Sequence, residues 1–277
     1  VNDAPALKRA DVGTAMGIKG TQVAKQSAEM VLADDNFASI ARAVKEGRTV
    51  YQNLRKSIQF ILPTNGAQAG VIVAAILFGL TLPITPVQIL WVNRVTAVTL
   101  ALTLAFEPPE RNIMRRPPRN VSTPILDSFL LWRICLVSSV LIVGTVGVFL
   151  WELQRGEPLE ASRTAAINAL VMGQVFYLLS VRYDTAAAWL PKNLGGNRWI
   201  YAAIATVLGL QALFTYWGPM TSLFGTAPID SLAWLWAVMV GLLVFFAVES
   251  EKAWRRRASR PQLQPGRRAV PVDRPVR

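Results

Sequence analysis

The chain has 277 residues, of which 52% are hydrophobic, with one cysteine and no histidine. These counts exclude a disulfide framework, a histidine-based zinc site and a Ser-His-Asp catalytic triad. The formal net charge is +12, but the basic residues lie between apolar blocks and in the segment after Trp254. That distribution is typical of membrane proteins, so we predict no nucleic-acid partner.

The first 52 residues read as the edge of an α/β domain. Residues 11–17, "DVGTAMG", predict a short strand closed by glycine, and residues 21–32, "TQVAKQSAEMVL", have helical spacing. Capping residues at 34–36 then precede a long helical pattern through residue 58. Because the chain opens in mid-motif without methionine, we expect it to be part of a longer protein.

Long apolar stretches follow, each of which can span a bilayer core of about 30 Å. They lie near residues 57–80, 86–106, 128–151, 165–181, 199–217 and 232–248. The fold class that we predict is a mainly α, polytopic membrane protein. Its domains are the α/β part at 1–52, a six-helix membrane region at 53–250 and a basic, disordered tail at 251–277.

The loops between these stretches alternate in charge. The second and fourth loops are basic, whereas the first, third and fifth carry few or no basic residues. The positive-inside rule then places both termini in the cytoplasm. We expect the chain to lie in the plasma (inner) membrane, with the lipid bilayer as a partner.

Three segments together resemble a known family. They are "VNDAPALKRADVGTAMG" at 1–17, "GTQVAKQSAEMVLADDNF" at 20–37, and "PVQILWVNRVT" at 86–96 with "EPPERNIMRRPPR" at 107–119. They are similar to P-type ATPases of the cation-pump branch related to calcium and sodium/potassium pumps. A weaker likeness continues through "SRTAAINALVMGQ" at 162–174.

The resemblance implies that residues 1–52 end a phosphorylation domain of the haloacid-dehalogenase type. There an aspartate outside this chain accepts the ATP γ-phosphate and Mg²⁺ supports the transfer. By motif position, Asn2 would contact phosphate and Asp3 would bind magnesium, as the catalytic residues of this piece. The alternative is that "NDAP" is only a turn with a helix cap. The phosphorylated aspartate and the nucleotide domain belong to the N-terminal part of the pump, so we expect the fragment alone to be inactive.

Polar residues interrupt three of the apolar stretches. Arg94 is notable, because an arginine at bilayer depth costs about 3 kcal/mol on insertion scales. Such residues mark a functional site by default, so we predict a site for the transported cation. Its residues are Asn65, Gln68, Asn93, Arg94, Thr96 and Gln174.

The resemblance also shows a departure from the calcium-pump pattern. Gln68, Ala97 and Gln174 stand where that pattern has or can have carboxylates. Because Ca²⁺ favours several anionic oxygens, a monovalent ion or a proton fits this set better, with Arg94 as a built-in counter-charge.

Other interpretations of these residues and of the whole chain remain open. Arg94 can be structural, and Gln68, Thr96 and Gln174 can simply bond between helices. Gly66 and Gly70 favour close packing. For the whole chain, the alternative is a non-enzymatic polytopic membrane protein, either a passive channel or a scaffold that binds a pump.

Overall fold

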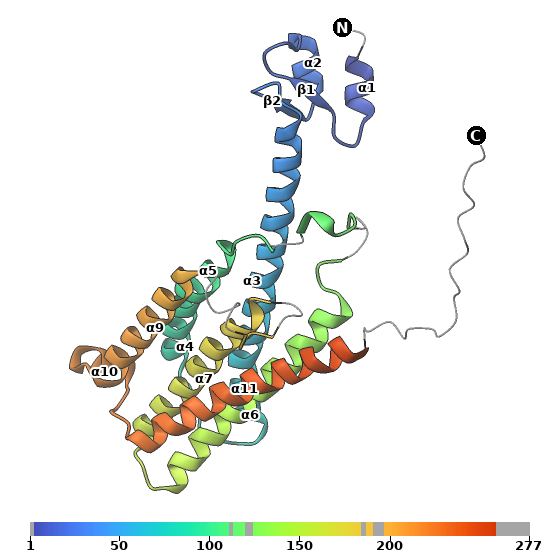
Figure 1. Cartoon of the computed structure of the whole chain (residues 1–277). Helices are drawn as coiled ribbons and strands as arrows, with labels where there is room; N and C mark the ends of the chain where they lie inside the picture. Colours follow the sequence, from blue (N-terminus) through green and yellow to red (C-terminus); the bar gives the residue numbers. More distant parts are fainter. Residues whose placement is uncertain (1–2, 111–112, 120–123, 184–186, 191–196, 259–277) are drawn as a thin grey trace, which may run out of the picture.

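The computed structural model describes residues 3–110, 113–119, 124–183, 187–190 and 197–258. A small N-terminal lobe sits at one end of a long helix, and the other end of this helix is packed into a helical bundle (Figure 1). The lobe therefore stands clear of the bundle.

The lobe contains two short helices and two short strands: α1 (Ala4–Arg9), β1 (Thr14–Met16), α2 (Gln22–Ser27) and β2 (Met30–Leu32). The strands pair in parallel, with Ala15 opposite Val31. The sequence-based helix over 21–32 is therefore wrong in its last third. Hydrogen bonds to the backbone of β1 override the helical spacing there, a tertiary effect that periodicity alone does not detect.

Asp35 closes the lobe against the start of the long helix. It has a left-handed backbone with φ of 50°, and its carboxylate accepts hydrogen bonds from the amides of Ile18 and Lys19 at 2.8 Å each. The bond from the Ile18 amide is the main cause that lowers the pKa of Asp35 below its ordinary value. Aspartate tolerates this backbone better than most residues, so the tight turn and the hydrogen bonds support each other.

The long helix is α3 (Ala38–Leu77), which is continuous through Pro63. At about 1.5 Å per residue its 40 residues extend roughly 60 Å, twice the thickness of a bilayer core. Its first half is therefore a stalk and its second half a membrane span.

The bundle surrounds the second half of α3. A hairpin leads to α4 (Pro86–Thr96), the π-helix η1 (Ala97–Ala101) and α5 (Leu102–Ala105), which together make one span. The remaining elements are the 3₁₀ turn η2 (Ile113–Arg115), α6 (Ser128–Gln154), α7 (Leu159–Val181), α9 (Arg198–Tyr216), α10 (Gly218–Phe224) and α11 (Ser231–Ala258).

Helix α7 is the central helix of the bundle. It packs against α3, α4, α6, α9 and α11, and 83% of its most apolar 18-residue window is buried, against 33 to 39% for the other spans. Small residues allow this close packing. A Cβ on Gly173 of α7 would lie 2.3 Å from Leu141 Cδ2 of α6, and in the neighbouring contact between α3 and α6 a Cβ on Gly70 would lie 2.2 Å from Ile142 Cδ1.

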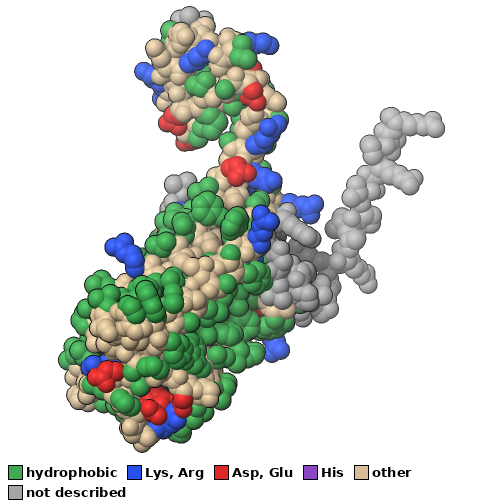
Figure 2. Space-filling model, turned by 90° about the vertical axis from the view of Figure 1, so that its left-hand side faces the viewer, with side chains coloured by type: hydrophobic (Ala, Val, Ile, Leu, Met, Phe, Trp, Pro, Cys, Tyr) green, Lys and Arg blue, Asp and Glu red, His purple; other side chains and the backbone are tan. Residues whose placement is uncertain are grey.

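Within the described residues, six helices are long and apolar enough to cross a membrane. Figure 2 shows hydrophobic side chains over most of the visible face of the bundle, while Lys and Arg side chains gather on the lobe and stalk. The predicted fold class is confirmed: a polytopic, mainly helical membrane protein with a small α/β part in front. The predicted domain boundaries at residues 52 and 250 stay predictions.

The predicted disorder of residues 251–277 is wrong at its start, because α11 continues to Ala258. Glu251 pairs with Arg133 of α6, and Lys252 Nζ contacts both Glu249 Oε1 at 2.7 Å and the carbonyl oxygen of Ser180. These buried charges fix the end of the helix against its neighbours. Residues 259–277 lie outside the described residues.

A second buried ionic cluster joins four segments at the lobe end of the bundle. Glu107 pairs with Arg182 at 3.1 Å and accepts a hydrogen bond from Asn197 at 3.3 Å. The side-chain amide of Asn53 in α3 donates to the carbonyls of Ala105 and Glu107, at 3.1 and 2.8 Å. The end of α5, the end of α7, the start of α9 and the stalk are thereby held at one level.

Candidate functional site

The two residues predicted at a phosphate and magnesium site lie at the start of the lobe. Asp3 is the N-cap residue of α1, yet its side chain makes no capping hydrogen bond, and the residue is exposed. Its carboxylate oxygens are thus able to face a cation, which fits Mg²⁺ chemistry in part. Among the described residues no group of three or more Asp, Glu, Cys or His lies together, so Asp3 would supply one ligand only. Asn2 lies outside the described residues.

The six residues predicted at the intramembrane site divide by exposure. Gln68, Thr96 and Gln174 are buried, with exposed fractions of 3%, 5% and 0%. Asn93 is half-buried, whereas Asn65 and Arg94 are exposed on the surface of this chain. The bundle alone therefore encloses only part of the predicted set.

Helix geometry puts the six residues in one layer of the bundle. The bond from Asn53 to the Ala105 carbonyl ties α3 to α5. From this tie, α3 runs away from the lobe while α4 to α5 runs back toward it (Figure 1). Asn65 follows Asn53 by 12 residues and Asn93 precedes Ala105 by the same 12, which is about 18 Å of helix in each case. Asn65 and Asn93 are thus at about the same depth.

Gln174 of α7 belongs to the same layer. It lies three residues before Tyr177, whose hydroxyl donates a 2.7 Å hydrogen bond to the Gln59 carbonyl of α3. By the same helix rise, Gln174 and Thr96 each lie about 14 Å from the level of Asn53, and Gln68 lies about 23 Å from it. The six residues span roughly 10 Å of depth near the middle of the membrane region.

The span that carries Asn93, Arg94 and Thr96 changes its winding directly after them. Residues Ala97–Ala101 form the π-helix η1, in which Thr99 Oγ1 bonds the carbonyl of Val95. Single π-turns inside α-helices are frequent at functional sites, because they free and re-aim backbone carbonyls. The sequence contains no proline or glycine there, and our sequence analysis did not predict the irregularity.

Pro63 lies inside α3, where it removes one hydrogen bond of the continuous helix. Proline has no N–H, so the carbonyl of Gln59 loses its helical donor. The hydroxyl of Tyr177 replaces that donor, and Ser138 Oγ of α6 donates to the carbonyl of Pro63 itself at 2.8 Å. A polar group of a neighbouring helix thus satisfies the freed carbonyl.

Tyr177 and Ser138 are therefore site-supporting residues that sequence reasoning missed. Tyr177 follows Gln174 by three residues and so shares its helix face, which is the signal that could have found it. Ser138 has no comparable signal in the sequence.

Gln68 and Gln174 are the residues of the layer whose buried side-chain amides are available to bind a ligand. Within the described part of the chain, neither the Oε1 nor the Nε2 atom of either side chain has a hydrogen-bond partner. Thr96 differs, because its Oγ1 donates to the Val92 carbonyl of its own helix at 2.8 Å. Unsatisfied buried amides are costly, so two of them in one layer indicate a place for water or a cation.

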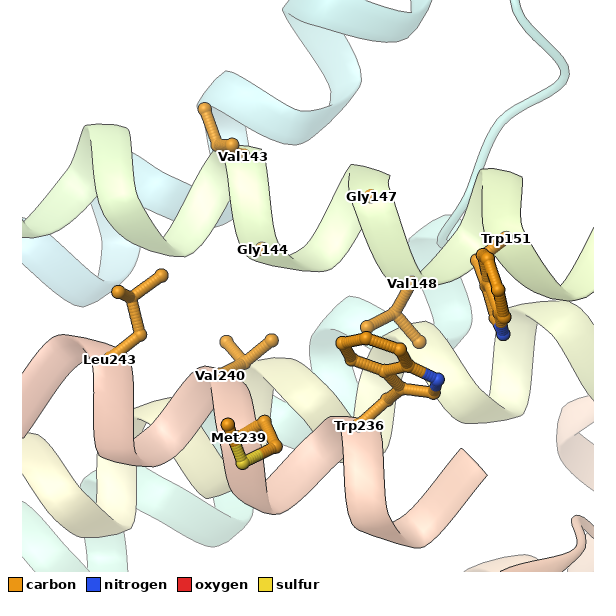
Figure 3. A pocket seen from close by; sticks show the side chains of 9 residues that line it. All are labelled: Val143, Gly144, Gly147, Val148, Trp151, Trp236, Met239, Val240 and Leu243. Atoms are coloured by element: carbon orange, nitrogen blue, oxygen red, sulfur yellow. The ribbon is translucent and has the colours of Figure 1, made fainter. Parts of the chain in front are cut away.

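A separate hollow between α6 and α11 has no such chemistry. It encloses about 400 Å³ and is lined by apolar side chains and two glycines, with Trp151 and Trp236 at one end (Figure 3). The two indole rings lie 5.5 Å apart. Since oxygen ligands are absent from its lining, this hollow does not fit a cation site.

Comparisons with known proteins agree on one family. The family described as "Cation transporting ATPase, C-terminus" matches residues 81–254. The chain is 46% identical over 252 residues to "Probable cation-transporting ATPase F" of Mycobacterium tuberculosis, covering 90% of this chain and 28% of that protein. It is 45% identical to "Cation-transporting ATPase pma1" of Synechocystis, covering 84% of this chain and 26% of that protein.

A third relative is the "Calcium-transporting ATPase" of Bacillus subtilis, which is 34% identical over 93% of this chain and 29% of that protein. The chain thus spans less than a third of the length of these relatives. With six candidate spans among the described residues, a layer of buried amides and a family match over most of its length, the chain belongs to the cation-transporting P-type ATPases, as a C-terminal part of such a protein.

Proposed function

We propose that this chain supplies part of the intramembrane cation site of an ATP-driven cation pump in the plasma membrane. The observation that carries the proposal is the layer in which Gln68 and Gln174 keep their amides buried and unbonded among the described residues. Asn65, Asn93 and Arg94 lie at about the same depth, with Asn65 and Arg94 exposed on the surface of this chain and Asn93 half-buried. An N-terminal part of the pump that packs on this surface would close the site.

The ion that fits this half best is monovalent or a proton. The layer offers amide oxygens, a threonine hydroxyl that is already bonded, and the positive charge of Arg94. A dehydrated Ca²⁺ needs several anionic oxygens, which this half does not provide. In this proposal the guanidinium of Arg94 pairs with a carboxylate on the N-terminal part of the pump.

The lobe has a separate role in the pump. Asn2 and Asp3 contribute to the phosphate and Mg²⁺ site of a cytoplasmic phosphorylation domain, and both termini lie in the cytoplasm. When bound, Mg²⁺ would neutralise charge on the transferred phosphoryl group. The exposed, uncapped carboxylate of Asp3 supports this role.

The test uses the complete pump that contains this chain, reconstituted in vesicles, with ATPase activity measured against Na⁺, K⁺, Mn²⁺, Ca²⁺ and pH. We expect Gln68→Leu and Gln174→Leu to raise the half-activating cation concentration at least ten-fold. Gln52→Leu, which removes a buried amide of α3 outside the layer, is the matched control and should leave it unchanged. Activation by micromolar Ca²⁺ would refute the monovalent assignment, and ATP-independent flux would indicate a passive channel instead.

Two more variants separate the remaining roles. Arg94→Leu should change the cation or pH dependence, and an unchanged dependence would make Arg94 structural. Asp3→Ala should weaken the Mg²⁺ dependence of phosphoenzyme formation, whereas Asp11→Ala, in the same exposed lobe, should not.

A further inference from the structure

A second pocket lies where the stalk enters the bundle. It encloses about 500 Å³ between α3 and the segment that leads into α6. Its polar lining comprises the guanidiniums of Arg48, Arg55, Arg116 and Arg119, the carboxylate of Asp127, the amide of Gln52 and the ring of Tyr51. The pocket therefore brings four positive charges and one negative charge into one hollow.

The contacts of Arg48 hold its guanidinium in place without balancing its charge. Arg48 Nη1 donates to the carbonyls of Ile113 and Arg116, each at 2.8 Å, and both of these acceptors are neutral. Arg119 lies over the ring of Tyr51 at 4.6 Å from its centroid. Arg55 pairs with Asp127 at 2.6 Å, which uses the one carboxylate of the lining.

A carboxylate outside the lining does not remove the excess. Glu110 pairs with Arg116, but it also pairs with Lys56 at 3.4 Å, so it is shared between two cations. Like charges held together repel one another, and a bound anion relieves this repulsion. Planar guanidiniums match phosphate oxygens with two parallel hydrogen bonds, so a phosphate group is the anion that this lining fits.

The surroundings of the pocket indicate where the phosphate comes from. Asp127 directly precedes Ser128, the first residue of a candidate membrane span. Leu54, Ile125 and Leu126, next to pocket residues in the sequence, are exposed apolar side chains, and Trp132 is exposed one turn into α6. A cationic hollow beside exposed apolar residues has the chemistry of the boundary between headgroups and acyl chains.

We propose that this pocket binds the phosphate headgroup of an anionic phospholipid in the leaflet on the lobe side of the bundle. The headgroup contacts the arginines, and the acyl chains run along the apolar residues at the start of α6 and beside the stalk. The lipid thereby bridges the stalk and the segment before α6. A soluble phosphate ester has the same headgroup chemistry but does not use the apolar rim.

The experiment titrates the detergent-solubilised chain with dioleoylphosphatidylglycerol, dioleoylphosphatidylcholine or glycerol 3-phosphate and counts bound molecules by native mass spectrometry. We expect phosphatidylglycerol to bind at least ten-fold more tightly than the other two. Each arginine near an anionic headgroup contributes roughly a five-fold preference, so Arg116→Gln with Arg119→Gln should weaken phosphatidylglycerol binding about 25-fold.

The matched control removes two positive charges from the exposed stalk outside the pocket, as Arg42→Gln with Lys45→Gln, and should retain full binding. If the double pocket variant unfolds, the single Arg119→Gln variant, which keeps the pair of Arg116 with Glu110, should still lose about five-fold. Equal binding to pocket and control variants would overturn the proposal. Equal binding of glycerol 3-phosphate and phosphatidylglycerol would also overturn it, in favour of a soluble anion.

Discussion

The carbonyl of Gln59 is satisfied only because a residue far along the chain reaches it. Pro63 removes its local donor, and Tyr177 supplies a hydroxyl from α7. Stacking of the Tyr177 ring on Phe60, at 5.9 Å between centroids, holds the hydroxyl in position. A tertiary contact beside the candidate site thus replaces the hydrogen bond that Pro63 removes from α3.

We predict that Tyr177→Phe destabilises the bundle by about 1 to 2 kcal/mol, because it leaves a buried carbonyl without a donor. In a Pro63→Ala background the helix regains its N–H, so the same substitution should cost less than half as much. Unfolding in mixed detergent micelles gives the four free energies of this double-mutant cycle. A cycle with no coupling energy would mean that Tyr177 stabilises the bundle through its ring alone.

At the residue scale the sequence identified the types of polar side chain in the layer but not their exposure. Asn65 and Gln68 are three residues apart on α3, yet one is exposed and the other is buried. The rotation of a helix about its axis depends on what packs against it, and a single sequence does not contain that information. The same limit applies to Arg94 and Thr96.

At the scale of single elements, the sequence predicted those helices whose formation depends on the residues within them. The apolar blocks predicted the candidate membrane spans to within a few residues, apart from α3, α7 and α11, which extend further into polar sequence, and they did not predict the short α10. Strand β2 was missed because three residues that pair with a distant strand leave no periodic pattern of their own. The π-turn of η1 was missed because it depends on packing around the helix.

The glycines of α3 provide a prediction about helix packing. Gly70→Ala should destabilise the contact of α3 with α6 by about 1 to 3 kcal/mol, since its Cβ would overlap Ile142. Adding Ile142→Val, which removes the atom that is overlapped, should recover part of the loss. Thermal unfolding monitored by circular dichroism would measure both.

Gly47 is the matched control on the same helix, because a Cβ there meets nothing within 4 Å. Gly47→Ala should raise stability by about 0.5 to 1 kcal/mol through its higher helix propensity. If both alanine substitutions changed stability equally, helix propensity rather than packing would explain Gly70.

Across the whole molecule, buried ion pairs join segments that are far apart in sequence. Glu107 and Arg182 are separated by 75 positions and have side chains only 4% and 2% exposed. Hydropathy and loop charge predicted the number and order of the spans. They did not predict this pair, because each residue looked like a normal loop charge at the end of a span.

We predict that Glu107→Gln costs about 3 to 5 kcal/mol, because it leaves the guanidinium of Arg182 buried without a counter-charge. Asp230→Asn is the control, since it breaks the exposed pair of Asp230 with Arg155 and should cost less than about 1 kcal/mol. Chemical unfolding of both variants in the same detergent compares them. Similar losses would show that Glu107 is hydrated in the membrane-embedded protein.

The unbroken α3 has a mechanical consequence. A rod about 60 Å long that is gripped near its middle acts as a lever, so a tilt of about 10° moves its free end by roughly 5 Å. The helix is held there by the bonds that Arg48, Asn53 and Lys56 make with Ile113, Glu107 and Glu110 in the segment after α5. A displacement of the lobe would therefore tilt or rotate the membrane half of α3, which carries Asn65 and Gln68. Pro63 is the position at which this helix can bend.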